Sequence, residues 1–183
     1  MRLPHAWILG MTLTGCGCSG PVTSEAGGDT MAIKLTSSVF NEGQSIPAKY
    51  TGDGSDKSPP LAWSDCPAGT ASLVLICEDP DAPVGTWTHW VLFDMPANQR
   101  KLAEGVPTDE TLADGSRQGK NDFRKIGYGG PAPPPGKPHR YFFKLYALDV
   151  KLELPAGASR KQLLTAMKGH VLAEGQLMGT YQR

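Results

Sequence analysis

Two short segments of the sequence gather side chains that can bind ions or exchange protons. The first holds Asp79 and Asp81, which alternate with prolines up to Pro83 at the end of an apolar run. Proline fixes φ and removes a backbone donor, so the two carboxylates are expected on a stiff turn. The peptide bond before Pro83 is a candidate for the cis form. A turn of this kind would hold a binding group in place before a ligand arrives.

A strand that carries a histidine is expected directly after this turn. Side chains alternate between the two faces of a strand, so Trp87, His89 and Val91 are predicted on one face. Trp90 and Leu92 are predicted on the opposite face. His89 therefore shares a face with Trp87.

The second segment is a run of glycines and prolines, residues 127–138, that leads straight into another strand pattern. Alternation places His139 and Tyr141 on one face and Arg140 on the other. Glycines such as Gly129 expose backbone amides that can bind an anion, whereas prolines remove such donors. The run is not a P-loop, because no Gly-Lys pair in this sequence is followed by Ser or Thr.

The elements around these segments indicate a mainly β domain. Short apolar runs separated by Pro and Gly clusters predict strands at residues 32–37, 71–77, 89–94, 140–148 and 177–182. One helix is predicted after Ser159, an N-cap residue, because Leu163 and Met167 recur at helical spacing until Gly169. The loops at 51–60 and 98–138 exceed usual connection lengths, so they are expected to carry function.

Composition narrows the classes of partner. Basic and acidic residues are balanced, with 18 Lys+Arg and 18 Asp+Glu, so no overall positive field favours nucleic acid, and none is expected as a partner. An oxidising compartment would permit a disulfide between Cys66 and Cys77. Cys77 ends an apolar run, however, where a buried free thiol is commoner. No cysteine spacing fits a structural zinc site, and no metal or other cofactor is expected.

The N-terminus is typical of an exported lipoprotein. A basic start, a short apolar stretch and the tetrapeptide that ends at Cys16 predict a signal peptide over residues 1–15 and a lipid anchor on Cys16. Residues 16–31 are rich in Gly, Ser and Thr and are expected to be a flexible tether to the domain at 32–183. The anchor would place the domain in the cell envelope, on a membrane. Translation from Met31 is the alternative and would give a cytoplasmic protein.

The two segments together resemble the signature regions of the phosphatidylethanolamine-binding protein family. The resemblance rests on the motif from Asp79 to Pro83, on Trp87-Thr88-His89, and on the Gly-Pro loop that ends in His139-Arg140-Tyr141. It extends over nearly all of residues 32–183 and is closest to the bacterial branch called Raf-kinase-inhibitor-like. It implies a large antiparallel sheet packed on a smaller one, with one or two short helices near the C-terminus.

The resemblance also implies a small mouth that binds phosphate, phosphoethanolamine or similar anions without catalysis. Carried over by position, its lining would be Asp79, Pro83, His89, Gly129, His139 and Tyr141, with Asp81 and Trp87 as support. Imidazoles can donate to a phosphate oxygen and gain protons as the anion arrives, which agrees with this role.

Two other functions stay open for this cluster. One is a metal-assisted or acid-base phosphoester hydrolase that uses the same Asp and His side chains. The other is a protein-interaction or inhibitor module. The C-terminal tail after Tyr181 is short, so an open pocket is expected and kinase regulation transfers poorly.

Overall fold

The structure is a computed structural model that describes residues 31–64 and 66–183. The predicted signal peptide, Cys16 and the tether up to residue 30 lie outside the described residues. The first strand begins at Met31, the last residue of the predicted tether.

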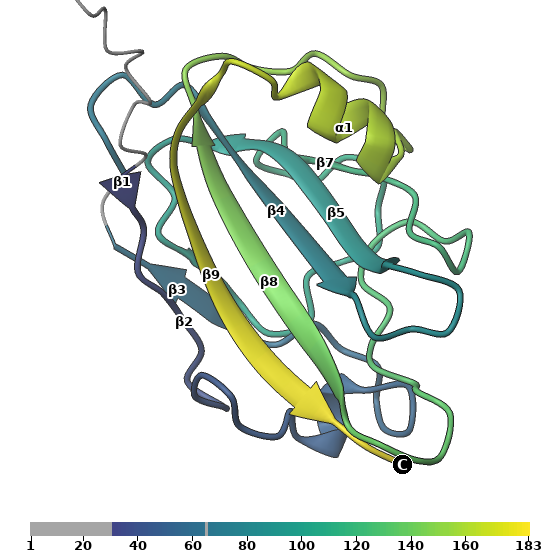
Figure 1. Ribbon diagram of the computed structural model, residues 1–183. Helices are drawn as coiled ribbons and strands as arrows, with labels where there is room; N and C mark the ends of the chain where they lie inside the picture. Colours follow the sequence, from purple (N-terminus) through teal and green to yellow (C-terminus); the bar gives the residue numbers. More distant parts are fainter. Residues whose placement is uncertain (1–30, 65) are drawn as a thin grey trace, which may run out of the picture.

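Two sheets form the framework of the described residues (Figure 1). The large sheet has the order β1-β9-β8-β4-β5-β7, and only β1 runs parallel to its neighbour. Its strands are β1 (Met31–Ala32), β9 (Val171–Tyr181), β8 (His139–Leu148), β4 (Ser72–Asp79), β5 (Trp87–Pro96) and β7 (Arg117–Gln118). The small sheet has the order β2-β3-β6, formed by β2 (Leu35–Thr36), β3 (Leu61–Trp63) and β6 (Lys101–Leu102). This arrangement confirms the predicted fold class.

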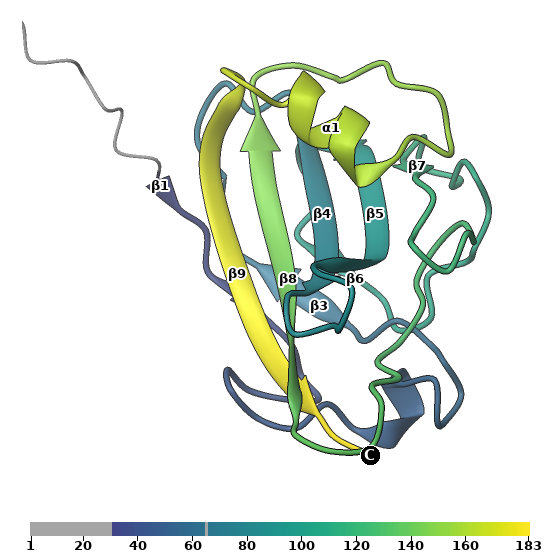
Figure 2. The same cartoon turned by 45° about the vertical axis from the view of Figure 1, so that its right-hand side comes forward.

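Alternation along the central strands separates two cores. In β4, Leu73, Leu75 and Cys77 face the small sheet, whereas Val74 and Ile76 face the helix α1 (Arg160–Ala166). Figure 2 shows α1 lying across one face of the large sheet at one end, with β3 and β6 on the other side. Cys77 is a fully buried free thiol in the core between the sheets, as the sequence indicated.

The single strand predicted at residues 32–37 is wrong. It divides into β1 and β2, which belong to different sheets, because the chain crosses from the edge of one sheet to the edge of the other. The strands β3, β6 and β7 have only two or three residues. Such elements are too short for a periodic pattern to identify.

A β-bulge in β5 redirects the histidine of the site. Cys77 pairs with Trp90, but the next residue of β4, Glu78, pairs with Thr88, so His89 has no partner of its own. A bulge inserts an extra residue and changes the direction of the side chains around it. Trp90 accordingly packs in the core between the sheets and Val91 in the core under α1. The prediction that Val91 shares the face of His89 is therefore wrong.

The helix α1 begins where the sequence predicted. The Ser159 side chain accepts a hydrogen bond from the Gln162 backbone, and the Gln162 side chain accepts one from the Ser159 backbone, which completes a capping box. Leu163 and Met167 are buried against the large sheet. Among the described residues, no helix has the length and apolar character needed to cross a membrane.

We expect the cap to contribute measurably to stability. Ser159→Ala leaves the backbone N–H of Gln162 without its side-chain acceptor and should lower the free energy of unfolding by about 1 kcal/mol. Thr165→Ala removes a hydroxyl from the same helix, one that donates to the Lys161 carbonyl, and should change stability by less than about 0.5 kcal/mol. Urea denaturation measures both. Equal effects of the two substitutions would contradict the capping role.

Candidate functional site

A pocket of about 200 Å³ lies where the ends of β4, β5 and β8 meet two loops. Its floor is formed by side chains from the strands, and its wall by the turn after Asp79 and by the Gly-Pro loop. The lining residues are Asp79, Ala82, Pro83, Val84, Trp87, His89, Phe123, Ala132, Pro133, Pro134, His139 and Tyr141.

Antiparallel pairing of β4 with β8 brings Asp79 to His139. Glu78 pairs with Phe142, so the next residue of β4 reaches the start of β8. There Oδ2 of Asp79 lies 2.7 Å from Nδ1 of His139. Oδ1 of Asp79 accepts from the backbone N–H of Asp81 at 2.7 Å, which closes the turn. The Asp79 carboxylate is therefore nearly buried but hydrogen-bonded on both oxygens.

The second carboxylate stabilises the turn from outside the pocket. Asp81 accepts two hydrogen bonds from the Arg140 guanidinium, at 2.7 and 2.9 Å, and one from the Arg140 backbone. These hydrogen bonds hold the pKa of Asp81 at about 2. Asp81 is thus a charged clamp between the turn and β8, and Arg140 points away from the pocket, as alternation predicts.

His89 is held by the Gly-Pro loop through two hydrogen bonds. Its Nδ1 lies 2.6 Å from the carbonyl oxygen of Gly129, and the Gly129 N–H donates to the His89 carbonyl at 2.9 Å. A carbonyl only accepts, so Nδ1 carries the proton and Nε2 is left for another partner. Burial lowers the pKa of His89 below its ordinary value. The imidazole is therefore mainly neutral at pH 7 in the unliganded pocket.

Tyr141 contributes a buried hydroxyl that no other described residue satisfies. The residue is fully buried, and its hydroxyl makes no hydrogen bond of good geometry within the described residues, although the Asp79 carboxylate lies close enough to act on it. Its ring meets the His89 ring edge to face, with the centroids 5.2 Å apart. Burial and the charge of Asp79 raise the pKa of Tyr141 well above its ordinary value, so the hydroxyl stays protonated and can donate. A buried donor without a partner in a pocket favours a ligand that brings a hydrogen-bond acceptor.

The loop at 51–60 anchors the Gly-Pro loop. The Gly130 N–H donates to Asp56 at 2.6 Å, the Gly52 N–H to the Pro131 carbonyl at 2.8 Å, and the Tyr128 hydroxyl to the backbone of residue 50 at 2.7 Å. The amides of Gly129 and Gly130 are thus engaged within the protein. The expectation that such glycines offer their amides to an anion is therefore wrong for Gly129 and Gly130. Proline has no backbone N–H, so the loop has few other donors through which it can be anchored.

The structure brings most of the predicted site residues together. Six of the eight line the pocket: Asp79, Pro83, Trp87, His89, His139 and Tyr141. Asp81 lies outside as expected for support, and Gly129 acts through its carbonyl instead of lining the pocket. No peptide bond of the described residues is cis, so the hypothesis for the bond before Pro83 is wrong.

Several lining residues escaped the sequence analysis. Phe123 is the most substantial of them, an aromatic ring in the long loop that was expected to carry function. A lone aromatic in a polar, solvent-facing loop was the available signal. Val84 and the apolar residues 132–134 complete the wall, and nothing in their pattern separates them from ordinary turn residues.

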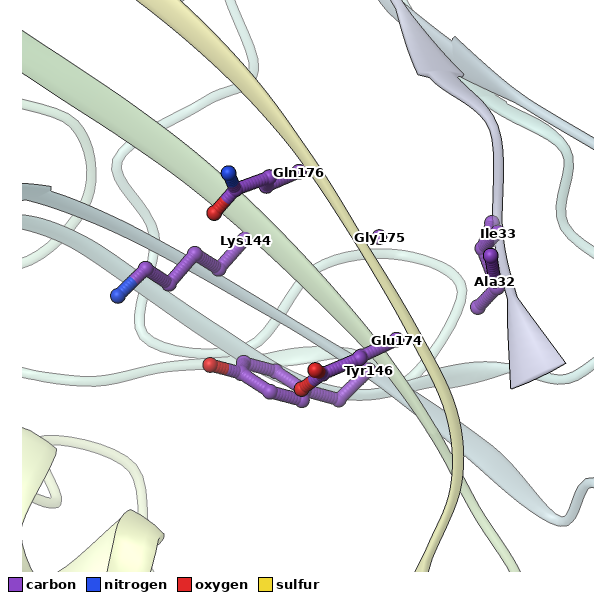
Figure 3. A pocket seen from close by; sticks show the side chains of 7 residues that line it. All are labelled: Ala32, Ile33, Lys144, Tyr146, Glu174, Gly175 and Gln176. Atoms are coloured by element: carbon purple, nitrogen blue, oxygen red, sulfur yellow. The ribbon is translucent and has the colours of Figure 1, made fainter. Parts of the chain in front are cut away.

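A second and larger cavity lies on the sheet surface at the other side of β8. Figure 3 shows Lys144 and Tyr146 from β8 and Glu174 and Gln176 from β9 around it, and its volume is about 440 Å³. Lys144 is bound there by Glu78, which also accepts from Arg160 of α1. None of the predicted site residues lines this cavity. The pocket at Asp79 is therefore the candidate site.

The described residues hold no group of three or more His, Cys, Asp and Glu side chains placed to bind a metal ion. In the pocket the acid and the two imidazoles instead face a shared space with the Tyr141 hydroxyl. This set can donate hydrogen bonds and take up protons.

Comparisons with known proteins agree with this architecture. A sequence profile of the phosphatidylethanolamine-binding protein family matches residues 36–182. A UPF0098 protein of Methanothermobacter thermautotrophicus is 52% identical over 151 residues, which cover 82% of this chain and 99% of the relative. A UPF0098 protein of Aquifex aeolicus is 50% identical over 160 residues, covering 86% and 92%.

Two solved structures are similar in fold and sequence. The crystal structure of a phosphatidylethanolamine-binding protein homolog from Chlamydia trachomatis has a TM-score of 0.76 and 44% identity, covering 83% of this chain and 98% of that one. Escherichia coli YbcL, described as a member of the mammalian family, has a TM-score of 0.77 and 32% identity, covering 82% and 98%.

The orphaned hydroxyl predicts an unusual effect on stability. Tyr141→Phe removes a buried donor that has no partner and should raise the free energy of unfolding of the ligand-free protein by about 1 kcal/mol. Tyr128→Phe is the matched control, because its buried hydroxyl does donate to a carbonyl. That substitution should lower the free energy of unfolding by about 1 kcal/mol. Chemical denaturation that finds Tyr141→Phe the more destabilising of the two would show the Tyr141 hydroxyl to be satisfied.

Proposed function

This chain belongs to the phosphatidylethanolamine-binding protein family, and from its pocket we propose that it binds a small phosphate-type anion. Family membership supports a ligand-binding role. The finer assignment, a phosphate or phosphorylated headgroup as ligand, rests on the chemistry of the pocket. One observation carries it: the buried, unpartnered hydroxyl of Tyr141 beside two imidazoles.

The donors of the pocket fit a tetrahedral anion. The Tyr141 hydroxyl can donate one hydrogen bond to the anion. His89 and His139 can each donate one more through Nε2 once that nitrogen is protonated. Hydrogen bonds from a charged imidazole to an anion are shorter and stronger than neutral ones. Asp81 lies outside the pocket, and its charge is compensated by Arg140. Among the described residues that line the pocket, Asp79 is the one carboxylate.

The size of the pocket favours a small ligand. Sites for drug-sized molecules usually enclose about 300–1,000 Å³. The 200 Å³ of this pocket suits a phosphate or a phosphorylated headgroup better than a nucleotide.

Binding explains the pocket better than catalysis does. No Ser or Cys lines it, and the Tyr141 hydroxyl, whose pKa is raised, is a poor nucleophile at neutral pH. Asp79 and His139 form a pair that can hold an imidazole in position, but among the described residues that line the pocket neither this pair nor His89 faces a side chain suited to act as a nucleophile. We therefore propose a binding protein and not a phosphoester hydrolase.

We expect inorganic phosphate and phosphoethanolamine to bind weakly and to need the acid-imidazole pair. His139→Ala and Asp79→Ala should each abolish the binding that calorimetry detects, while far-UV circular dichroism stays unchanged. His170→Ala is the matched control, because His170 forms a similar imidazole-carboxylate pair with Asp149 at 2.8 Å, away from the pocket. For sulfate, whose own charge does not change near neutral pH, affinity should increase as the pH falls, because a bound anion favours the protonated form of His89, whose pKa is lowered by burial.

Two results would overturn this proposal. One is unchanged phosphate affinity in both pocket variants. The other is turnover of phosphoester substrates by the wild-type protein that disappears in His89→Ala, since that would make the site an active site.

We also propose, from the sequence alone, that the domain is exported and anchored to a membrane through Cys16. Mass spectrometry of the protein purified from its own host should find a chain that starts at Cys16 and carries a diacylglycerol group. An unmodified chain that starts at Met31 would contradict the anchor and place the domain in the cytoplasm.

A further inference from the structure

Phe123 is a partly exposed aromatic side chain that covers the histidine of the pocket. Its ring meets the ring of His89 edge to face at a centroid distance of 5.3 Å and the ring of Trp87 in the same way at 5.4 Å. The side chain is 38% exposed, whereas His89 beneath it is 3% exposed. Phe123 thus stands between solvent and the imidazole.

Hydrogen bonds hold the loop around Phe123 in place beside the pocket. The Asn121 amide donates to the Gly127 carbonyl and accepts from the Lys125 N–H, both at 3.0 Å. Asp122 is tied to Thr88 of β5 by hydrogen bonds of 2.6 and 3.0 Å. These contacts hold the two sides of the loop, so the ring position is set by the backbone.

Gly129 supplies the space that the ring occupies. A Cβ atom on Gly129 would lie 2.8 Å from Cδ2 of Phe123, closer than real contacts allow. The same glycine accepts from Nδ1 of His89 through its carbonyl. Ring, glycine and imidazole therefore form one packed unit.

Burial dominates the electrostatic surroundings of His89. The carboxylates of Asp79 and Asp122 and the carbonyls of Gly129 and Gly130 all favour the charged imidazole. Tyr141 and Phe123 add uncharged rings, and His139 places a second imidazole in the same pocket. Despite two carboxylates and two carbonyls, the pKa of His89 is lowered, because desolvation outweighs them.

We propose that Phe123 controls proton uptake in the pocket: its ring shields one side of the His89 imidazole from water and so couples anion binding to uptake of a proton. The inference rests on the proposed anion binding. With the ring in place, His89 is neutral until an anion arrives, and the proton then passes from solvent to Nε2. The bound state contains an imidazolium and the anion, which compensate each other in the low-dielectric pocket.

The test separates the ring from the rest of the site. We would follow the titration of His89 by NMR in the ligand-free protein and measure sulfate affinity by calorimetry at about pH 5.5 and about pH 7.5. Sulfate is the probe because, unlike phosphate, it does not titrate in this range. The variants are Phe123→Ala, Phe123→Leu, which keeps an apolar cover, and Gly129→Ala, which displaces the ring without removing it.

In Phe123→Ala the pKa of His89 should rise toward its ordinary value of about 6.5. The ratio of the sulfate affinities at the two pH values should therefore shrink by about two- to threefold. Gly129→Ala should change the His89 titration in the same direction. Phe123→Leu should retain most of the wild-type pH dependence of sulfate affinity. Val171→Ala is the control, because Val171 is also an exposed apolar residue but lies at the far end of β9 from the pocket.

An unchanged His89 titration in folded Phe123→Ala and Gly129→Ala would overturn this inference while leaving the phosphate proposal intact. Loss of the pH effect in Phe123→Leu as complete as in Phe123→Ala would also overturn it, since ring contact and not water exclusion would then be responsible. If the wild-type protein binds neither sulfate nor phosphate at either pH, the proposed function falls, and with it the coupling to an anion.

Discussion

The burial of one carboxylate, that of Asp79, governs the construction of the site. A charge removed from water is costly unless it is hydrogen-bonded or paired. Asp79 ends a strand whose preceding residue, Glu78, is also nearly buried, and alternation sends the two to opposite faces of the sheet. Glu78 is compensated by Lys144 and Arg160 on the outer face. Asp79 has no Lys or Arg partner in the part of the chain that the structure describes, and it depends on His139 and on the turn that follows it.

This dependence gives the pocket its chemistry. The charge of Asp79 and burial together keep Tyr141 protonated, and burial keeps His89 neutral. The Asp79 carboxylate would repel an anion, so the proposed phosphate-type ligand should bind better when the His89 imidazole gains a proton with it. Under the proposed function, this arrangement makes the affinity for an anion increase as the pH falls. A permanently charged lysine in the same place would bind anions without that sensitivity.

Sequence patterns predicted the site wherever the strands are regular. β8 pairs without interruption from residue 139 to 147, so alternation correctly placed His139 and Tyr141 together and Arg140 outside. β5 broke the same rule at Val91, because its bulge arises from pairing with β4, which local sequence does not reveal. The ring of Phe123 was missed for a related reason. Its position depends on hydrogen bonds to β5 and on the space at Gly129, both set by tertiary contacts.

The floor and the wall of the pocket are built by different means, and this bears on how the site can vary. The floor is formed by the long strands β4, β5 and β8, which pack on a buried core on each face of the sheet. Asp79, His139 and Tyr141 therefore cannot shift without disturbing the sheet. The wall is carried by loops that are tied down through hydrogen bonds at a few points, such as Asp56 to Gly130. Substitutions in such loops cost less stability than those in a core. Substitutions in the wall can therefore change the proposed ligand preference and proton coupling while the polar side chains of the floor stay fixed.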